Sequence, residues 1–557
     1  MLEKFLKQTE FSSYEDMIKN FEFVIPENFN FGFDVIDEWA RTEPEKRALV
    51  WCNPQGDEKE FTFTDISQMS NRTANMLKSM GLKKGDVAML LLKRRWEYWV
   101  IAPACHKLGV TIVPVNHLMK KKDLVYRINK ANVTAVICVN EEMAIAELER
   151  ALENDCPQVE NKIVIQDPRE GWVYFNEEYL KYSPVFERPT GEEATQNDDT
   201  MLMYYTSGTT GMPKIVSHNY LYPLGHIVTA CYWHRVVNNG LHMTVADTGW
   251  AKAGWGKIYG QWIGGTANFV YDFDRFNADD LLKLISKYKL TTFCAPPTIY
   301  RFIVKEDLSK YDFSSLTHCC TAGEALHAEV FNTFEKQTGH KIYEGFGQTE
   351  TTVMLATFPW MNPHPGSMGR PSPAYKVHLL DDNYNEVDVG KTGYLAVETD
   401  KYPVGLFVGY EYDIEEQKEK FRNGYYFTGD MAWKDEYGYY WFVGRSDDII
   451  KTSGYRVGPF EIESVLMQHP SVLECAITGA PDPVRGQVVK ATIVLTKGYE
   501  PSEELKDELK TYVKVNTAPY KYPRIIEFVT ELPKTSSGKI RRNVIRDVDN
   551  KDENPTR

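Results

Sequence analysis

Between residues 48 and 166, short apolar runs alternate with longer stretches whose apolar residues recur at helical spacing. The run at residues 87–92 is apolar throughout, which is typical of a strand buried on both faces of a sheet. A helix capped by Thr64 or Asp65 is predicted before this run, and a helix over residues 95–108 after it. Because the same alternation continues, the pattern predicts βαβ units and a largely parallel sheet.

A second series of the same kind follows later in the chain. Residues 291–295, 319–324 and 341–345 each read as a short strand, and the last two run into glycine-containing turns. Turns at the ends of parallel strands are where α/β proteins place their ligands. This series therefore predicts a ligand site along one edge of a second set of strands.

The pattern changes twice towards the C-terminus. Over residues 367–441, short strands and turn signals predict a small antiparallel sheet or distorted β-barrel. Residues 459–529 then combine helical and strand patterns in a compact α+β arrangement. The predicted fold class is α/β, with a large N-terminal domain of parallel α/β sheets plus the small barrel, and a small α+β C-terminal domain.

Both ends of the chain are rich in charged residues. Residues 1–20 predict a charged amphipathic helix without the apolar core of a signal peptide, and residues 546–557 are predicted to be disordered. No uninterrupted apolar run is long enough to cross a bilayer, so we expect no membrane span.

The 557 residues exceed what one hydrophobic core supports, so at least two domains are expected. A formal net charge of -14 argues against a general nucleic-acid binder. The nine cysteines are odd in number and include no Cys-x-x-Cys pair, which favours reduced thiols in a cytoplasmic protein over disulfides or a zinc site. The oligomeric state is left open, a homodimer included.

The stretch at residues 201–214 carries the first chemical signal. An apolar run, predicted to be a buried strand, breaks into a loop of glycines and hydroxyl residues that ends in a proline and a lysine. Such a loop can surround an anion closely and offers N–H, hydroxyl and ammonium groups to phosphate oxygens, although it is not a Walker A loop. Taken alone, it can equally be an ordinary turn between a strand and a helix. The anion-binding candidates are Thr206, Ser207, Gly208, Thr209, Thr210, Gly211 and Lys214.

Four more motifs follow this loop in order. They are Glu344-Gly-Phe-Gly-Gln-Thr-Glu350, Tyr426-Phe-Thr-Gly-Asp430, and the segments at residues 444–456 and 532–541. Each motif alone is weak, because a Gln-Thr-Glu can be a helix cap and a Thr-Gly-Asp a β-turn. Together, the five resemble the adenylate-forming superfamily of acyl-CoA synthetases, adenylation domains and firefly-type luciferases. The segments at 247–250 and 295–300 are most similar to the medium-chain acyl-CoA synthetase branch, near the acetyl-CoA synthetases.

The resemblance implies an ATP-dependent reaction that uses Mg²⁺ and CoA. A carboxylate attacks the α-phosphate of ATP and releases pyrophosphate, and the CoA thiol then attacks the acyl-adenylate. This chemistry depends on positioning and charge neutralisation. By resemblance, residues 206–214 hold the β- and γ-phosphates, Thr349 contacts the α-phosphate and Glu350 is the magnesium ligand. The other implied ATP and AMP contacts are Gly323, Glu324, Ala325, Glu344, Gly345, Phe346, Gly347 and Gln348 around adenine, Asp430 and Arg445 at the ribose, and Arg456 at phosphate.

The resemblance also divides the chain at Asp447, which matches the family's hinge. The implied domains are residues 1–446, the AMP-binding domain, and residues 447–557, a mobile domain. The second domain carries Lys539, the implied catalytic residue of adenylation, whose ammonium would bridge the substrate carboxylate and the α-phosphate. The implied CoA contacts are Ser453, Gly454, Tyr455, Arg485, Tyr522, Pro523 and Arg524.

The acyl pocket implied by the resemblance contains Trp233, Trp250, Lys252, Trp255, Cys294 and Gly347. Position 347 carries a tryptophan in the acetate-specific branch, so glycine there leaves room for a longer acid. Trp255 is placed to shorten or bend the pocket, although each of these aromatic residues can also be plain core. We therefore predict a small-molecule carboxylic acid substrate, short-to-medium in chain length or branched, and larger than acetate.

Three functions are weighed for the chain. The first is an acyl-CoA synthetase of fatty acid metabolism, an AMP-forming acid–thiol ligase. The second is an aryl-acid CoA ligase, or an acyl-AMP ligase that loads a carrier protein. The third is a non-catalytic nucleotide-binding or regulatory protein. Such a protein would be expected to have lost Lys539, Glu350 or Asp430, and all three are present, which argues against this function.

Overall fold

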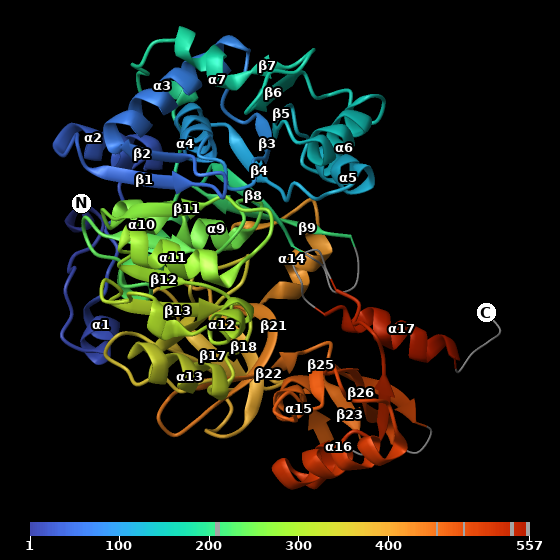
Figure 1. The fold of residues 1–557 in the computed structure, drawn as a ribbon. Helices are drawn as coiled ribbons and strands as arrows, with labels where there is room; N and C mark the ends of the chain where they lie inside the picture. The colour runs from blue at the N-terminus through green and yellow to red at the C-terminus, as the bar shows by residue number, and fades with distance from the viewer. Residues whose placement is uncertain (207–211, 453–454, 483–484, 535–539, 553–557) are drawn as a thin grey trace. The chain divides into compact units, whose positions relative to one another are not determined.

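The computed structural model describes residues 1–206, 212–452, 455–482, 485–534 and 540–552 (Figure 1). The chain forms two compact units, each described by itself below. The first consists of Met1–Thr206, Lys214–Lys376 and Lys401–Lys418, and the second mainly of Val377–Asp400 and Glu419–Arg557.

The first sheet of the first unit has the strand order β19-β9-β8-β4-β3-β5-β6-β7. Its strands from β8 to β7 run parallel, whereas β9 and β19 are antiparallel additions at one edge. In Figure 1, helices α3 and α4 lie on one side of strands β3 to β6, and α5 and α6 on the other. The strands are β3 (Val87–Leu91), β4 (Thr111–Pro114), β5 (Ala135–Val139), β6 (Asn161–Ile165), β7 (Val173–Tyr174), β8 (Thr200–Thr206), β9 (Lys214–Asn219) and β19 (Gly409–Glu411).

The second sheet of this unit has the order β16-β15-β14-β13-β12-β10-β11-β1-β2. The strands from β14 to β1 are parallel, so their carboxyl ends lie at one edge. The strands are β1 (Arg47–Cys52), β2 (Glu58–Thr62), β10 (Leu241–Thr244), β11 (Ala267–Tyr271), β12 (Thr292–Cys294), β13 (His318–Ala322), β14 (Ile342–Phe346), β15 (Leu355–Ala356) and β16 (Ser367–Pro371).

The helices of the first unit connect these strands. They are α1 (Tyr14–Asn20), α2 (Glu38–Thr42), α3 (Phe63–Ser79), α4 (Tyr98–Leu108), α5 (Lys121–Lys130), α6 (Glu142–Leu152), α7 (Phe175–Glu178), α8 (Tyr222–Ile227), α9 (Ala251–Gly256), α10 (Tyr259–Ile263), α11 (Ala278–Tyr288), α12 (Pro297–Ile303) and α13 (Ala328–Thr338). Helix α14 (Ile414–Lys420) leads from the first unit into the second.

Apolar side chains fix the second sheet against its helices. Leu281 and Ile285 of α11 and Phe334 of α13 belong to one buried cluster with Phe269 and Phe293 of the strands. Full burial of such a side chain is worth about 1.5–3 kcal/mol. This cluster gives the carboxyl ends of β10, β12, β13 and β14 a rigid base.

The second unit contains two antiparallel ladders and a small α+β part. One sheet has the order β17-β18-β21-β22, with β20 paired to β21, and the other has the order β24-β23-β26-β25, with β27 parallel to β26. The elements are β17 (Val377–Leu380), β18 (Thr392–Glu398), β20 (Phe421–Arg422), β21 (Tyr425–Lys434), β22 (Tyr440–Arg445), β23 (Ile450–Thr452), β24 (Tyr455–Val457), α15 (Pro459–Leu466), β25 (Val472–Asp482), β26 (Gly486–Leu495), α16 (Glu503–Asn516), β27 (Ile525–Phe528) and α17 (Arg542–Asp552).

The predicted parallel α/β layout, the antiparallel region after residue 367 and the α+β part are therefore all observed. Helix α3 begins two or three residues earlier than expected, because Thr62 rather than Thr64 or Asp65 caps it. Thr62 and Asp65 form a reciprocal capping box, in which each side chain accepts from the other residue's backbone N–H.

Both predictions for the chain ends need correction. Residues 1–20 form no single helix: α1 begins at Tyr14, capped by the Ser13 side chain, and Leu6 pairs with Phe23 in a β-bridge. Residues 546–552 belong to the helix α17, in which Ile545 is buried and Arg546 pairs with Asp448 at 2.6 Å. The remaining residues of the predicted disordered tail, 553–557, lie outside the described residues.

The nine cysteines are all free thiols, as predicted. Among the described residues, no helix combines the length and the apolar character needed to cross a membrane.

Candidate active site

The carboxyl edge of the second sheet collects many of the predicted site residues. Strands β13 and β14 are parallel neighbours, with Ala322 opposite Gly345. Residues 323–325 therefore leave β13 beside the point where residues 347–349 leave β14. The left-handed backbone of Gly323, with φ +106, starts this turn, which a residue with a side chain rarely adopts.

Glu344 holds this edge together from inside. Its buried carboxyl accepts backbone N–H bonds from Leu326 at 2.9 Å and from Gly366 at 2.7 Å. Burial nevertheless raises the pKa of Glu344 to about 8. The side chain predicted to line the adenine site thus has its oxygens engaged with the backbone of two loops.

Replacing Glu344 by glutamine is expected to flatten the pH dependence of stability. The pKa of Glu344 is about 8 in the folded chain and 4.5 in the unfolded chain. Between these two pH values, the folded chain therefore keeps a proton that the unfolded chain has lost. The contribution is complete below pH 4.5 and is lost as pH rises through about 8. Relative to E344Q, the wild-type free energy of unfolding should fall by up to about 4 kcal/mol over this range.

Thermal unfolding of wild type and E344Q between about pH 5 and pH 8.5, roughly the range between the two pKa values, tests this expected difference in stability. Glu329→Gln, at an exposed position of α13, is the matched control and should follow the wild-type curve. Parallel curves for wild type and E344Q would contradict the assignment.

Thr349 and Glu350 follow β14 in a turn that other segments of the first unit hold. The Thr349 carbonyl lies 2.8 Å from Nε2 of the buried His218 on β9. Burial lowers the pKa of His218 to about 3, so this imidazole is neutral and donates to the carbonyl. Tyr410 of β19 donates its hydroxyl to Glu350 Oε1 at 2.8 Å, and the Phe407 N–H donates to the Glu350 carbonyl at 2.8 Å.

The described ends of the anion-binding loop are the paired residues Thr206 and Lys214. They face each other across the antiparallel ladder of β8 and β9, so the loop joins two strands rather than a strand and a helix. The Lys214 ammonium forms an ion pair with Glu416 of α14 and lies 5.9 Å from the centre of the Tyr410 ring. We call residues 407–417 the strap, because this segment contacts both Glu350 and Lys214.

Tryptophan indoles cover the backbone at the end of β14. A Cβ atom at Gly345 would lie 2.5 Å from the Trp233 ring, and one at Gly347 would lie 2.4 Å from the Trp255 ring. The two indoles meet edge to face, with centroids 6.2 Å apart at 88°. A side chain at position 347 and the Trp255 indole therefore exclude each other.

The remaining predicted pocket residues lie on neighbouring elements. Lys252 of α9 donates to the Ala322 carbonyl at the end of β13, at 2.9 Å. Cys294 is buried at the end of β12, opposite Cys320, and burial raises the pKa of its thiol. Trp250 directly precedes α9 as its N-cap residue. Strand ends and α9 thus bring the predicted acyl-pocket residues to the same sheet edge.

The second unit pairs Asp430 with Arg445. The two residues are opposite each other on β21 and β22, and Arg445 Nη1 donates to Asp430 Oδ1 at 3.3 Å and to the Thr428 carbonyl at 3.2 Å. Asp430 is buried. The Asp447 carbonyl accepts from Arg546 at 3.1 Å, and Arg445 Nε lies 3.7 Å from its carboxylate. The guanidinium of Arg445 thereby fixes the orientation of a buried carboxylate.

The predicted CoA contacts that the structure describes lie at the edge of the β26 sheet. The Arg524 N–H bonds to the Val489 carbonyl, and its guanidinium lies 5.0 Å from the centre of the Tyr522 ring. Lys514 of α16 lies 4.1 Å from the same ring centre. Pro523 is buried beside them, and the Arg485 N–H bonds to Asp482. The Tyr522 ring therefore lies next to two cationic side chains, an arrangement that suits an anionic ligand.

Sequence comparison decides the family. The AMP-binding enzyme family matches residues 36–410, and the AMP-binding enzyme C-terminal domain matches residues 461–539. The chain belongs to the AMP-binding enzyme family. Acyl-coenzyme A synthetase ACSM3, mitochondrial, of Mus musculus is 40% identical, covering 96% of this chain and 93% of its own length. Acyl-coenzyme A synthetase ACSM4, mitochondrial, of Rattus norvegicus is 39% identical, with 96% and 92% covered.

Solved structures agree with this membership. The anthranilate CoA ligase AuaEII, in complex with anthranoyl-AMP, has a TM-score of 0.85 at 30% identity and covers 95% of this chain and 99% of its own. A benzoate CoA ligase from Burkholderia xenovorans LB400 has a TM-score of 0.80 at 26% identity, with 93% and 100% covered. The predicted fold, the superfamily and the class of AMP-forming acyl-CoA synthetases are thereby confirmed.

Several predicted residues of this AMP-binding enzyme lie outside the described residues. They are Ser207, Gly208, Thr209, Thr210, Gly211, Ser453, Gly454 and Lys539. Tyr455 and Arg456 belong to β24, opposite Thr452 and Lys451, and only their backbone is described. Their predicted roles stay predictions.

Three residues that contact the predicted site were missed from the sequence. His218, Tyr410 and Glu416 reach it only through strand pairing and the strap. Glu416 lies in a segment rich in charged residues, including Glu415 and Glu419. Its charge alone therefore does not distinguish it as a site residue in the sequence. The antiparallel pairing of residues 409–411 with β9, almost two hundred positions earlier in the sequence numbering, is what brings the strap here.

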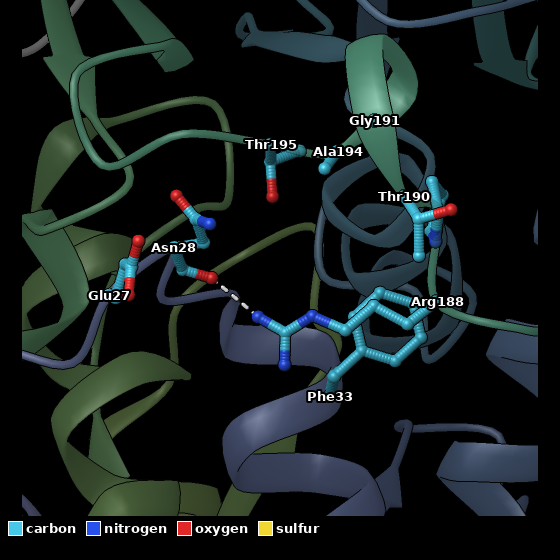
Figure 2. Close-up of a pocket in the computed structure, with 9 residues that line it drawn as sticks. Glu27, Asn28, Phe33, Arg188, Thr190, Gly191, Ala194 and Thr195 are labelled. Carbon is cyan, nitrogen blue, oxygen red and sulfur yellow. Dashed lines mark hydrogen bonds between the residues drawn. The ribbon is translucent and has the colours of Figure 1, made fainter.

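A separate cavity of about 360 Å³ lies on the first unit (Figure 2). Its described lining includes none of the predicted site residues. Arg188 dominates it, but this guanidinium already pairs with Asp34 at 2.7 Å and lies over the Phe33 ring at 5.3 Å. Many of the predicted site residues lie instead at the sheet edge, and none of them is among the described residues that line this cavity.

Proposed function

We propose that this acyl-CoA synthetase activates a short-to-medium-chain or branched carboxylic acid larger than acetate. The observation that supports the size of the acid is the pair of indoles, Trp233 and Trp255, against the glycine backbone at the end of β14. They give the sheet edge an apolar wall beside Thr349 and Glu350. An apolar wall of fixed position favours a hydrocarbon chain of limited length.

In the proposed first half-reaction, an oxygen of the acid attacks the α-phosphorus of ATP. The bond from that phosphorus to the bridging oxygen breaks, and pyrophosphate leaves with the electron pair of that bond, its negative charge offset in part by the cations that would bind it. Lys214, with the loop at 207–211, would hold the β- and γ-phosphates. Lys539 would lie between the carboxylate and the α-phosphate, and its single ammonium would offset the repulsion of the two anions.

The residues present fit a magnesium–nucleotide complex. Mg²⁺ usually takes one or two carboxylates and completes its shell with phosphate oxygens and water. Glu350 is such a carboxylate, held by the Tyr410 hydroxyl. Among the described residues, no group of three or more His, Cys, Asp or Glu side chains could hold a metal alone. When bound, the ion would neutralise phosphate charge, and Glu350 would orient it.

The nucleoside of ATP would contact two predicted sets of residues, one for the adenine and one for the ribose. Residues 323–325 and 344–348 would line the adenine, beside the Leu326 and Gly366 backbone that Glu344 holds. Asp430, oriented by Arg445, would accept the ribose hydroxyls, and Arg456 would bind phosphate. Each hydrogen bond to a charged group is worth about 1.5–3 kcal/mol.

In the proposed second half-reaction, the CoA sulfur attacks the acyl carbon, and AMP leaves as the carbon–oxygen bond breaks. The domain boundary would fall at residues 446 and 447, with Asp447 as the hinge. Residues 453–455 would line the path of the pantetheine arm. Arg485 and residues 522–524 would bind the CoA nucleotide, for which the cations around the Tyr522 ring are suited.

A pyrophosphate-release assay over linear, branched and aromatic acids tests the proposal, with thioester formation on CoA measured in parallel. The highest kcat/KM is expected for a short-to-medium linear or branched acid. A preference for aromatic acids would favour the aryl-acid CoA ligase, the activity named for the two structural relatives. Pyrophosphate release without CoA acylation would favour transfer to a carrier protein.

Replacing Trp255 by glycine is expected to shift the chain-length preference towards longer acids. The indole lies over Gly347 and would no longer limit the pocket. Because one methylene in an apolar pocket is worth about 1–3 kcal/mol, the shift should be graded over a series from butyrate to laurate. Trp172→Phe, at the partly exposed end of another sheet, is the control. An unchanged profile in a folded W255G protein would count against the pocket assignment.

Two further expectations stay predictions. The cytoplasmic location is not supported by the relatives, whose names place them in mitochondria. A homodimer is one assembly to be tested by sedimentation.

A further inference from the structure

Lys214 of the anion-binding loop is already neutralised by a carboxylate. Its ammonium forms an ion pair with Glu416, and the side chains are only 25% and 17% exposed. A pair shielded to this extent is screened less by salt than a surface pair. The lysine proposed to bind phosphate therefore has an internal anionic partner.

The strap places Glu416 at this position through its own hydrogen bonds. The Tyr410 N–H donates to Gln417 Oε1 at 2.9 Å, and the Glu416 N–H donates to Asp413 Oδ1 at 3.3 Å. Gly409 lies so close to Gln417 that a Cβ atom would stand 2.9 Å from its Oε1. The first turn of α14 is thus tied to the edge strand β19, and β19 is paired with the strand that begins at Lys214.

A carboxylate and a phosphate oxygen make the same demand on an ammonium group. Both are anionic acceptors, and in both cases the preferred distance from the ammonium nitrogen to the acceptor oxygen is about 2.7–2.9 Å. A lysine offers one compact charge, so full engagement with one anion weakens its engagement with the other. Binding of phosphate at Lys214 must then displace or share the Glu416 carboxylate.

We propose that Glu416 competes with the phosphates of ATP and pyrophosphate for Lys214. The inference rests on the proposed role of Lys214 in phosphate binding. Glu416 lowers the affinity of the loop for both anions, because only the fraction of molecules with a released Lys214 binds fully. For pyrophosphate this favours departure of the product, since the lysine regains an anionic partner as the leaving group goes.

The test compares wild type with Glu416→Gln, which keeps the shape of the side chain and removes its charge. The probe is inorganic pyrophosphate with Mg²⁺, titrated by calorimetry in the absence of acid and CoA. E416Q is expected to bind it about 3- to 10-fold more tightly. Glu415→Gln on the same helix is the matched control, because Glu415 is 87% exposed and pairs with Lys418 instead, and its affinity should equal that of wild type.

A double-mutant cycle separates competition for the lysine from the general field of a nearby carboxylate. In a Lys214→Gln background, competition predicts no further gain from E416Q, whereas a general field predicts the same gain as in wild type. Equal gains in both backgrounds would overturn the proposal. Weaker pyrophosphate binding by E416Q would also overturn it, because Glu416 would then be a support that orients Lys214 for the anion.

Failure of this inference and failure of the proposed function give different results. If wild type binds pyrophosphate and K214Q binds it less tightly, the phosphate role of Lys214 stands whatever E416Q does. If K214Q binds as wild type does, the phosphate role is wrong, and the competition is excluded with it. Thermal unfolding of each variant shows whether the protein compared is folded.

Discussion

Replacing Lys539 by alanine is expected to abolish acyl-adenylate formation and to leave thioester formation from supplied acyl-AMP intact. The ammonium is needed only while the carboxylate and the α-phosphate approach each other, because acyl-AMP already contains the new bond. Loss of a group that stabilises developing charge costs about 100- to 1,000-fold in rate, and a full charge between two anions should lie at the upper end. Exchange of labelled pyrophosphate into ATP measures the first step alone.

Lys534→Ala is the matched control for this variant. Lys534 belongs to the same motif, five residues before Lys539, but its ammonium pairs with Glu474 at 2.7 Å, so both half-reactions should keep their wild-type rates. Thioester formation is followed from synthetic acyl-AMP and CoA. If K539A slowed both half-reactions equally, the lysine would serve the fold or the general binding of AMP and not the adenylation step.

Replacing Glu350 by glutamine should slow adenylation by about 100- to 1,000-fold. The amide keeps the size of the side chain and can still accept from the Tyr410 hydroxyl, but it offers no charge to Mg²⁺. The loss should be smaller at high Mg²⁺, because the variant binds the magnesium–ATP complex less tightly. Calorimetric titration of ATP over a range of Mg²⁺ concentrations reports this change without turnover.

Tyr410→Phe provides the graded companion. It removes only the hydroxyl that orients Glu350, so the apparent Mg²⁺ affinity should fall by about 10- to 100-fold or less, as for other outer-shell partners of metal ligands. Tyr412→Phe, two residues along the strap and 60% exposed, should behave as wild type. Unchanged Mg²⁺ dependence in E350Q would remove Glu350 from the metal site.

The local pattern of apolar and polar residues predicted the strands around the site, because short runs of apolar residues indicate buried strands. Residues 87–92 and 341–345 are apolar or end in glycine, and they become β3 and β14. The site motifs were also readable, since Thr349 and Glu350 directly follow a strand end. The family resemblance then predicted a ribose role for Asp430 and Arg445, and the structure shows that these two residues pair.

Contacts that depend on distant pairing could not be predicted in this way. The glutamate at 344 belongs to a motif, yet nothing local shows that its oxygens bind the Leu326 and Gly366 backbone. The close approach of Trp255 to Gly347 requires the position of α9 on the sheet. The prediction of disorder was wrong for residues 546–552. It was based on the high charge of the segment, which does not show that Arg546 bonds to Asp447 and Asp448.

The edge strand β19 has a consequence for how the chain matures. Strand β9 would be an open edge, a template for pairing with other chains, until residues 409–411 cover it. During synthesis, the ribosome must therefore add the whole length matched by the AMP-binding family, residues 36–410, before this sheet can close. Pairing over so long a stretch is slow, and the waiting edge is a natural point for chaperone binding. The segment that contacts Lys214 and Glu350 in the finished enzyme is thus also the last strand that its first sheet receives.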